Sequence, residues 1–291
     1  MIKSYINKIK ANISIYASKK TSNILDGSYK SIYKGRSLNF EDLREYVIGD
    51  NIKDIDWKAS ARSGNILVRQ YIAEKKHNIM LVLDIGKKMR ADTSDGVLKK
   101  EIAIMSAGTM AYLASKNGDY VGATYDRDGL ISYFPFKEGL INVERILSNY
   151  DSDSEKVNES SLVKVLNYIN RFINKRMIIF IITDLQGMED IDENILKKLS
   201  LRHDVLIMNI SDAYMTGKKV YDIDGESYIP HIFLNDRKLF ELEKKAKEDL
   251  FKKCVKKCSK YKISISTISN TKEITNKTIE LLERHRDANK R

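Results

Sequence analysis

Two short apolar runs, each ending at an aspartate, constrain the fold of this chain more than any other feature. The first covers residues 78–84 and reads NIMLVLD; the second covers residues 177–183, MIIFIIT, and Asp184 follows it. A continuous apolar run of this length is typical of a strand buried on both faces, as in parallel sheets. Open α/β sheets place their ligand sites at the carboxyl ends of such strands. We therefore expect Asp84 and Asp184 to lie in one crevice.

Strands and helices alternate from residue 78 to the end of the sequence. This alternation predicts an α/β fold of three layers, with a mainly parallel sheet between two layers of helices. Further strands are expected at 119–126, 130–136, 204–210 and 262–268, the first two joined by a hairpin turn at Arg127-Asp128-Gly129. Helices are expected at 97–116, 138–149, 161–174, 192–201, 236–260 and 272–287, with a polar loop at 150–160 and an irregular stretch at 211–235. Residues 78–291 then form one domain.

Residues 1–77 form a separate N-terminal segment, part helical and part irregular. In residues 2–16, isoleucines and tyrosines recur at helical spacing with lysines between them, which predicts an amphipathic helix. Such a helix packs on its own domain or lies on a membrane surface, and both alternatives stay open. Residues 21–38 are expected to be loop with short strands, and residues 40–47 a helical turn.

The end of this segment concentrates charged residues around Trp57, the only tryptophan of the chain. Arg44, Asp50, Asp56 and Arg62 are suited to ion pairs that pin an irregular segment in place, because arginine binds carboxylates with two hydrogen bonds. The alternative is an exposed docking face. Clusters of ion pairs are more often structural than functional, which favours the first interpretation.

The net charge of +11 permits nucleic acid, anionic lipid or an acidic protein as a partner. No arginine-rich run and no aromatic-basic motif of an RNA-binding module occurs, so no nucleic-acid partner is expected; a basic membrane-surface binder remains an alternative. No apolar run reaches the roughly 18 residues of a spanning helix. The N-terminus also lacks the apolar region of a signal peptide. We expect a cytoplasmic protein.

Motifs of catalysis are missing from the sequence. It contains no GxSxG elbow, no phosphate-binding loop and no HExxH, and we therefore expect no enzyme activity. Cys254 and Cys258 fall on the apolar side of a helical pattern, which predicts buried free thiols rather than metal ligands. The alternative is a metal-dependent hydrolase in which Asp84 and Asp184, helped by the loop hydroxyls of Ser160 and Ser161, hold Mg²⁺.

The stretch R-E-Y-x-x-G-D-x-x-K-x-I-D-W-x-x-S-A-R resembles the hallmark of the bacterial family called domain of unknown function 58. Lys53 stands where the family usually has arginine, and Ile48 where it has proline. The resemblance implies a von Willebrand factor type A-like domain at 78–291 and a non-catalytic adaptor of a MoxR-type AAA+ ATPase. The signature, which would be its docking face, comprises Arg44, Tyr46, Gly49, Asp50, Asp56, Trp57, Ser60 and Arg62.

The resemblance also implies a position for a metal-ion-dependent adhesion site, which in type A domains reads D-x-S-x-S, then threonine, then aspartate. Asp84 and Asp184 match, Ser160 falls near the threonine, and Gly86 and Lys88 replace both serines. A cation about 4 Å from the Lys88 ammonium would be repelled by on the order of 4 kcal/mol at an effective dielectric near 20. We therefore expect no metal and no other cofactor. Lys88 either neutralises the two carboxylates itself or, like Lys87, faces solvent at the start of a helix, and both alternatives stay open. Weak magnesium binding at Asp84 and Asp184 is the alternative.

Overall fold

The computed structural model divides the chain into two compact units. One, the main unit, contains residues 1–32 and 77–291; the other, the signature unit, contains residues 33–76. The first 32 residues therefore belong with the main unit, whereas the sequence pattern had grouped them with the signature. The structure describes residues 4–16, 24–29, 42–70, 76–215, 221–222, 227–228 and 237–290.

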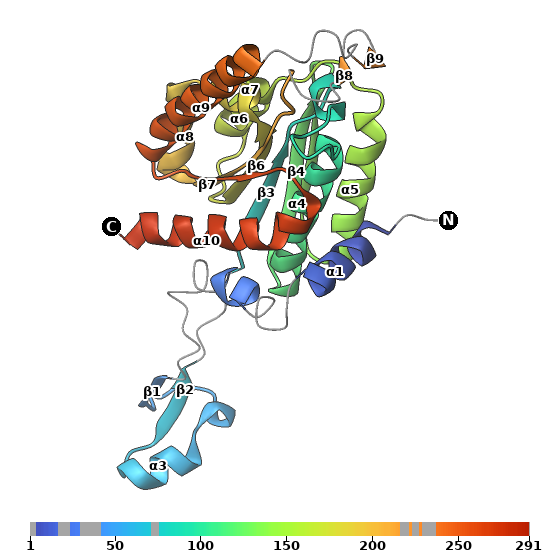
Figure 1. Cartoon of the computed structure of the whole chain (residues 1–291). Coiled ribbons are helices and arrows are strands. Elements are labelled where there is room, and N and C mark those ends of the chain that lie inside the picture. Colours follow the sequence, from blue (N-terminus) through green and yellow to red (C-terminus); the bar gives the residue numbers. More distant parts are fainter. Residues whose placement is uncertain are drawn as a thin grey trace. The chain divides into compact units, whose positions relative to one another are not determined.

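A six-stranded sheet in the order β10-β7-β6-β3-β4-β5 forms the centre of the main unit (Figure 1). All neighbouring strands are parallel except β4 and β5, which form the predicted hairpin through Asp128 and Gly129, both at positive φ. The strands are β3 (Asn78–Leu83), β4 (Tyr120–Arg127), β5 (Leu130–Lys137), β6 (Ile178–Asp184), β7 (Asp204–Ile210) and β10 (Ser264–Ile268). Every residue of β3 and β6 is buried, as their apolar runs predicted.

Helices cover both faces of the sheet, and the predicted three-layer α/β fold is confirmed (Figure 1). One layer contains α1 (Tyr5–Tyr16), α4 (Lys99–Lys116), α5 (Leu140–Ser154) and α10 (Ile274–Lys290). The other contains α6 (Leu162–Phe172), α7 (Leu185–Asp190), α8 (Glu193–Arg202) and α9 (Arg237–Ser259), whose apolar residues share one core with β3, β6, β7 and β10. Within the part of the chain that the structure describes, no helix combines the length and apolar character needed to cross a membrane.

Helix α1 packs on the main unit through its apolar side. Tyr5, Ile6, Ile9 and Ile13 are buried, and the helix contacts α4 and α5. A Cβ atom at Gly108 of α4 would lie 2.1 Å from Ile9 Cδ1, so the two helices approach closely. The apolar side of α1, which would have to insert into a membrane, is thus packed against the protein itself.

Several element boundaries differ from the sequence prediction. Helix α5 continues to Ser154, where a loop was expected from residue 150, because Tyr150 is fully buried and extends the apolar side of the helix. The short helix α7 was not predicted. The irregular stretch contains the two-residue strands β8 (Tyr221–Asp222) and β9 (Ser227–Tyr228), and most of its remainder lies outside the described residues. So does most of the loop expected at 21–38, of which residues 24–29 are described and helical.

The signature unit is a small hairpin with two short helices between its strands. Strand β1 (Asp42–Glu45) pairs antiparallel with β2 (Leu67–Gln70), and η1 (Ile52–Asp54) and α3 (Trp57–Ser63) lie between them in sequence. The helical turn expected at 40–47 was therefore wrong, because residues 42–45 pair with a distant strand. Among the side chains described in this unit, only Val68 is a buried apolar one.

Candidate functional site

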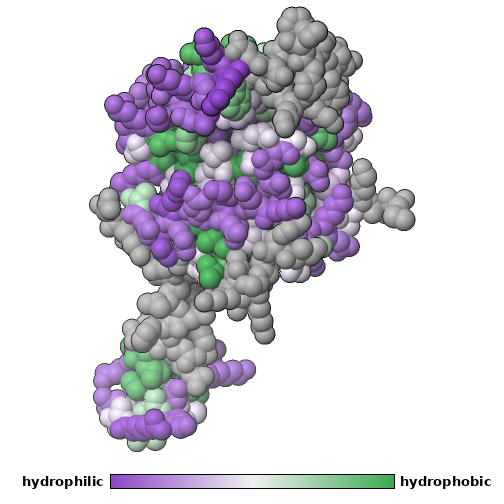
Figure 2. All heavy atoms as spheres, viewed as in Figure 1, coloured by the Kyte–Doolittle hydropathy of each residue, from purple (hydrophilic) through white to green (hydrophobic). Residues whose placement is uncertain are grey.

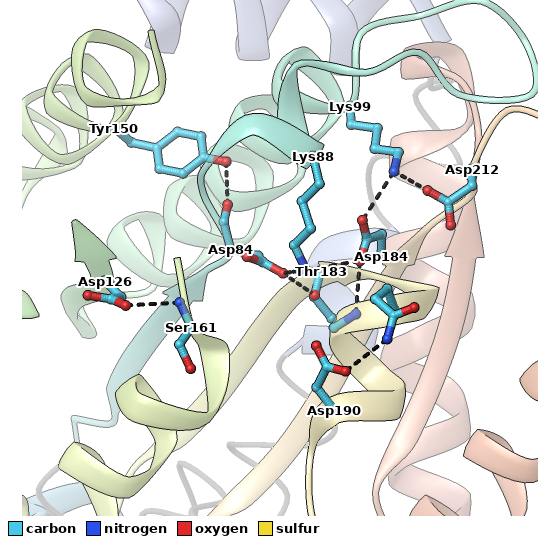
Figure 3. Close-up of polar contacts among 12 residues, drawn as sticks. Asp84, Lys88, Lys99, Asp126, Tyr150, Ser161, Thr183, Asp184, Asp190 and Asp212 are labelled. Atoms are coloured by element: carbon cyan, nitrogen blue, oxygen red, sulfur yellow. Dashed lines mark hydrogen bonds and ion pairs between the residues drawn. The ribbon is translucent and has the colours of Figure 1, made fainter. Parts of the chain in front are cut away.

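The two strand-end aspartates lie together at the carboxyl edge of the sheet, as predicted. Asp84 follows β3 and Asp184 ends the neighbouring parallel strand β6, where Leu83 is paired with Ile182. Both carboxylates are almost completely buried. Figure 3 shows them converging with side chains from η2, α4 and the segment after β7. We refer to this place as the strand-end crevice.

Lys88 bridges the two carboxylates. Its Nζ lies 2.6 Å from Asp84 Oδ2 and 3.2 Å from Asp184 Oδ1. It belongs to the single 3₁₀ turn η2 (Lys87–Arg90), which begins after Gly86. Gly86 has a φ of 105°, a conformation that favours glycine, and a Cβ there would lie 3.2 Å from the Asn158 carbonyl oxygen. The tight turn thus returns Lys88 to the end of its own strand.

A second lysine, Lys99, completes the cluster, and the sequence reasoning missed it. Its Nζ lies 3.1 Å from Asp184 Oδ2 and also pairs with Asp212. Lys99 is the first residue of α4 and is buried, although the sequence places it in an ordinary Lys-Lys pair. Asp212 follows two residues after the buried strand β7, so the rule that found Asp84 and Asp184 would also have found Asp212.

Further donors from the protein occupy the carboxylate oxygens. The Thr183 hydroxyl donates to Asp84 Oδ2 at 2.5 Å, and the Gly187 amide donates to Asp184 Oδ1 at 2.9 Å. Gly187 leaves no room for a side chain: a Cβ there would lie 2.0 Å from Thr183 Oγ1 and 2.7 Å from Asp84 Oδ2. On the other side, the Tyr150 hydroxyl donates to the Asp84 carbonyl oxygen at 2.7 Å. The crevice is therefore closely packed as well as charged.

Burial and charge act against each other on the pKa values in the crevice. Burial alone would raise the pKa of Asp184, but the Lys99 and Lys88 ammonium groups bring it below its ordinary value. For Asp84, burial raises the pKa more than Lys88 lowers it. Burial would lower the pKa of Lys88, and the two carboxylates reverse this and raise it. Lys88 thus keeps its charge, and Asp184 is the more readily ionised carboxylate.

The two loop hydroxyls that might have served as metal ligands lie next to the crevice, in different roles. Ser160 lies against Gly86, and its buried Oγ has no hydrogen-bond partner from the protein. Ser161 instead caps α6: its Oγ accepts from the Lys164 amide at 3.3 Å, and its own amide donates to Asp126 Oδ2 at 2.9 Å (Figure 3).

Cysteine and histidine side chains do not contribute to this site. Cys254 and Cys258 are buried on α9 without a disulfide, which confirms the prediction of free buried thiols. Burial raises the pKa of Cys258 to about 12 and also raises that of Cys254, so both remain protonated. Over the ranges that the structure describes, no group of three or more histidine, cysteine, aspartate or glutamate residues is arranged to hold a metal ion.

In the signature unit, Arg44 and Asp50 shape a turn. The guanidinium donates two hydrogen bonds to the Asp50 carboxylate, at 2.7 and 2.6 Å, and the Val47 amide donates to the same carboxylate at 2.9 Å. Gly49 lies inside this turn at a φ of 111°. The Tyr46 amide donates to the Ile66 carbonyl oxygen at 2.8 Å. These signature residues thus serve local folding.

Asp56 and Ser60 organise the short helix α3. The Asp56 carboxylate accepts hydrogen bonds from the Lys58 and Ala59 amides, both at 3.0 Å, as the N-cap of the helix. The Ser60 hydroxyl donates to the Asp56 carbonyl oxygen at 2.7 Å and accepts from the Leu67 amide at 2.8 Å. Ser60 therefore ties α3 to β2.

Of the network expected around Trp57, the ion pair between Arg44 and Asp50 forms, but it does not pack around the tryptophan, because that side chain is 65% exposed. Ile48 is 96% exposed, and Val47, Ile52 and Ile66 are exposed as well. In Figure 2, hydrophobic residues reach the surface of this unit among hydrophilic ones. A hairpin with two short helices has too little interior to bury them. Arg62 is also exposed. We call Val47, Ile48, Ile52, Trp57 and Ile66 the signature surface.

Comparison of the sequence with known proteins gives one family. The family model described as "Protein of unknown function DUF58" matches residues 42–216. Uncharacterised proteins of Mycobacterium bovis and Mycobacterium tuberculosis are each 22% identical over 202 residues, which is 69% of this chain and 63% of the relative. The chain thus spans less than two thirds of the length of these curated relatives.

Comparison of the structure gives similar solved proteins at low identity. BatB of Bacteroides thetaiotaomicron has a TM-score of 0.45 and 15% identity, over 71% of this chain and 99% of that one. An aerotolerance-related membrane protein of Bacteroides fragilis has a TM-score of 0.45 and 15% identity, over 71% and 98% of the two chains. A von Willebrand factor type A protein of Catenulispora acidiphila has a TM-score of 0.37 and 7% identity, over 72% and 42%.

Proposed function

Because this chain belongs to the DUF58 family of unknown function, we propose that it is a non-catalytic protein-interaction module that acts as an adaptor of a MoxR-type AAA+ ATPase. The proposal takes its partner from the likeness of the Arg44–Arg62 signature to that family. It locates the contact on the signature surface and assigns the strand-end crevice a structural role. It also places the protein in the cytoplasm, where ATP is available to such a partner.

The exposure of the signature surface carries this proposal. Arg44, Asp50, Asp56 and Ser60 are engaged in turns and caps, whereas Trp57 and Ile48 stand in solvent and contribute little to folding. Exposed apolar residues that gather on one small unit mark interaction sites, and tryptophan is enriched among the residues that dominate binding energy. The signature therefore combines residues that build a scaffold with residues that the scaffold presents.

The chemistry of the crevice supports the non-catalytic part of the proposal. Lys88 and Lys99 place two ammonium groups against Asp84 and Asp184, where a hydrolase would need a divalent cation. A cation there would meet the like charges of both lysines in a poorly hydrated place, which costs several kcal/mol at a distance of about 4 Å. We propose that the crevice is a degenerate metal-ion-dependent adhesion site in which lysine has replaced the metal.

A pull-down from the native cell, followed by mass spectrometry, tests the proposed partnership. The bait is the tagged full chain, compared with a W57A/I48S variant of the signature surface. An I141S variant is the matched control, because Ile141 is an 89% exposed apolar residue on α5 of the main unit. We expect a AAA+ ATPase in stoichiometric amount with the wild type and with I141S, and its loss with W57A/I48S. Absence of any such ATPase at low salt, or equal capture by the double variant, would contradict the proposal.

A further inference from the structure

An edge strand and the helix beside it bring three aromatic rings into one row. Strand β5 ends the sheet, and among the described strands only β4 pairs with it. Helix α6 contacts β5. The ring centroid of Tyr133 in β5 lies 6.2 Å from that of Tyr168 in α6, and Tyr168 lies 5.1 Å from Phe172, one helical turn further. We call Tyr133, Tyr168 and Phe172 the ring row.

The ring row is held by the core and reaches the surface. Tyr168 is half-buried and packs against the hydrophobic core. Tyr133 is 39% exposed and Phe172 is 60% exposed. The core-facing side of α6 is complete without these two rings, because Leu166 and Ile169 are fully buried. The rings are therefore fixed in place and partly open to a ligand.

Cationic side chains accompany the rings. The Arg171 guanidinium lies 5.4 Å from the centroid of the Phe172 ring. Lys164 lies beside the β4–β5 turn, since its Nζ would be 4.0 Å from a Cβ atom at Gly129. Strand β5 and helix α6 contain no aspartate or glutamate, and their net charge of +3 comes from Lys137, Lys164 and Arg171. Rings and cations thus share one surface, formed by β5 and α6.

We propose that this surface binds single-stranded nucleic acid. Bases stack on the ring row, while Lys164 and Arg171 contact phosphates of the same strand. Proteins bind single strands through this combination, because every base has a flat aromatic face and every nucleotide carries a negative charge. The sequence shows no such motif, because Tyr133 and Tyr168 are 168 − 133 = 35 residues apart and meet only in the fold.

Other anionic partners fit this surface less well. Interfacial binding to lipid relies on apolar side chains that insert together, whereas Phe172 is the one ring of the row without a hydroxyl. A nucleic-acid duplex offers phosphates, but its bases are stacked on one another and do not reach the rings. Single strands alone match both the charge and the rings.

This surface uses no residue of the signature surface. A failure of nucleic-acid binding would leave the proposed ATPase partnership untouched, and a failure of the pull-down would leave nucleic-acid binding untouched. The two proposals are thus tested independently on the same full-length protein.

The test is fluorescence anisotropy of the full chain with labelled strands of about 20 nucleotides. Oligothymidylate and oligouridylate distinguish DNA from RNA as the source of the strand. We expect at least one of them to bind at about 50 mM NaCl, more weakly at about 300 mM NaCl, and about tenfold more tightly than an abasic strand of equal length. Equal binding of the abasic strand, or tighter binding to phosphatidylglycerol vesicles, would overturn the proposal.

Matched variants separate this surface from general surface charge. Y133S/F172S removes the two exposed rings and K164Q/R171Q removes two charges, and each is expected to weaken binding about tenfold. The controls change the same kinds of residue at other exposed positions: W57A/I48S in the signature unit and K252Q/K253Q on α9.

Thermal unfolding by circular dichroism verifies that each variant is folded. If Y133S/F172S does not fold, K164Q/R171Q and the abasic strand decide, because they test the charge and the stacking separately. Losses in the controls as large as those in the two variants would overturn the proposal.

Discussion

The strand-end crevice and the signature unit use the same kinds of ion pair with opposite consequences. In the crevice, Asp84 and Asp184 are buried and depend on Lys88 and Lys99. In the signature unit, Arg44 and Asp50 form an equally close pair near the surface. Removing one partner of a buried pair leaves an unpaired charge out of water, whereas exposed pairs contribute little because water replaces the lost partner. The pairs in the crevice therefore stabilise the fold, whereas the Arg44–Asp50 pair shapes a turn that presents other residues.

The largest effect should follow from Lys99→Met. Its side chain is almost completely buried and paired with Asp184 and Asp212. Removing the ammonium leaves Asp184 to Lys88, which it shares with Asp84, and should cost about 3–5 kcal/mol in the free energy of unfolding. The measurement is a urea titration at neutral pH. Lys252→Met is the control: Lys252 is exposed and 3.5 Å from Asp249, and its loss should cost at most about 0.5 kcal/mol. Similar costs for both substitutions would contradict the claim that the buried pairs of the crevice stabilise the fold more than exposed pairs do.

Asp184→Asn should show a pH dependence that Asp50→Asn lacks. The folded-state pKa of Asp184 lies below its ordinary value of 3.8, so its ionised form stabilises the protein above that pH. This stability is lost as the pH falls through the lowered folded-state pKa. Asp184→Asn should therefore cost about 2–4 kcal/mol near neutral pH, with the cost shrinking toward about pH 2. The measurement is a series of urea titrations across this range.

The pKa of Asp50 is lowered too, through its hydrogen bonds with Arg44 and Val47, but this carboxylate lies near the surface. Solvent and salt screen such a pair. Asp50→Asn should thus change stability little at any pH, and less in high salt. A cost for Asp184→Asn that stays constant with pH would contradict the assignment of an ionised, paired carboxylate.

A smaller effect is expected from Gly187→Ala, which adds one methyl group to the packed crevice. The new Cβ would lie 2.0 Å from Thr183 Oγ1 and 3.0 Å from Lys88 Nζ, and overpacking of this kind should cost about 1–3 kcal/mol. Gly27→Ala is the matched control, since no atom lies within 4 Å of a Cβ at that helical position. Equal melting temperatures of the two variants would show that the atoms around Gly187 shift to accommodate the added methyl group at little cost.

The smallest of these effects should come from Asp56→Ala in the signature unit. Loss of the α3 N-cap should cost about 1 kcal/mol and act locally. Hydrogen exchange should therefore quicken at the α3 amides, while the melting temperature of the main unit stays the same. Asp56→Asn keeps an acceptor at the cap and should restore most of the protection. A fall in the main-unit melting temperature as large as that caused by Lys99→Met would contradict the local role of Asp56 as the cap of α3.

The centre of the sheet was predictable because β3, β6 and β7 are buried on both faces, so that nearly every position of these strands carries the signal. The run at 78–84 corresponds to β3 (Asn78–Leu83), and the run at 204–210 coincides with β7. Asp84 and Asp184 followed from the same rule, since each lies at a strand end, whereas Lys88 was singled out only through the resemblance to the type A adhesion-site motif. Lys99 followed from neither, because its partners Asp184 and Asp212 are 85 and 113 residues away in sequence.

The exposure of Trp57 was not predictable from the residues alone. Large apolar side chains are buried by default, and a lone tryptophan among arginines and aspartates has the pattern of a packed ion-pair network. What decides otherwise is the size of the unit around it, which depends on the pairing of β1 with β2 across more than twenty residues of chain. The polar signature residues likewise have the composition of a salt-bridge cluster, yet Asp56 and Ser60 act as a helix cap and a strand tie.

Calorimetric titration with MgCl₂ and with MnCl₂ tests most directly whether lysine has replaced a metal in the strand-end crevice. We predict no saturable binding by the wild-type protein in the micromolar range, because Lys88 and Lys99 already neutralise Asp84 and Asp184. Micromolar binding of either cation that disappears in Asp84→Ala would contradict this, and would turn the crevice from a closed structural site into a working metal centre.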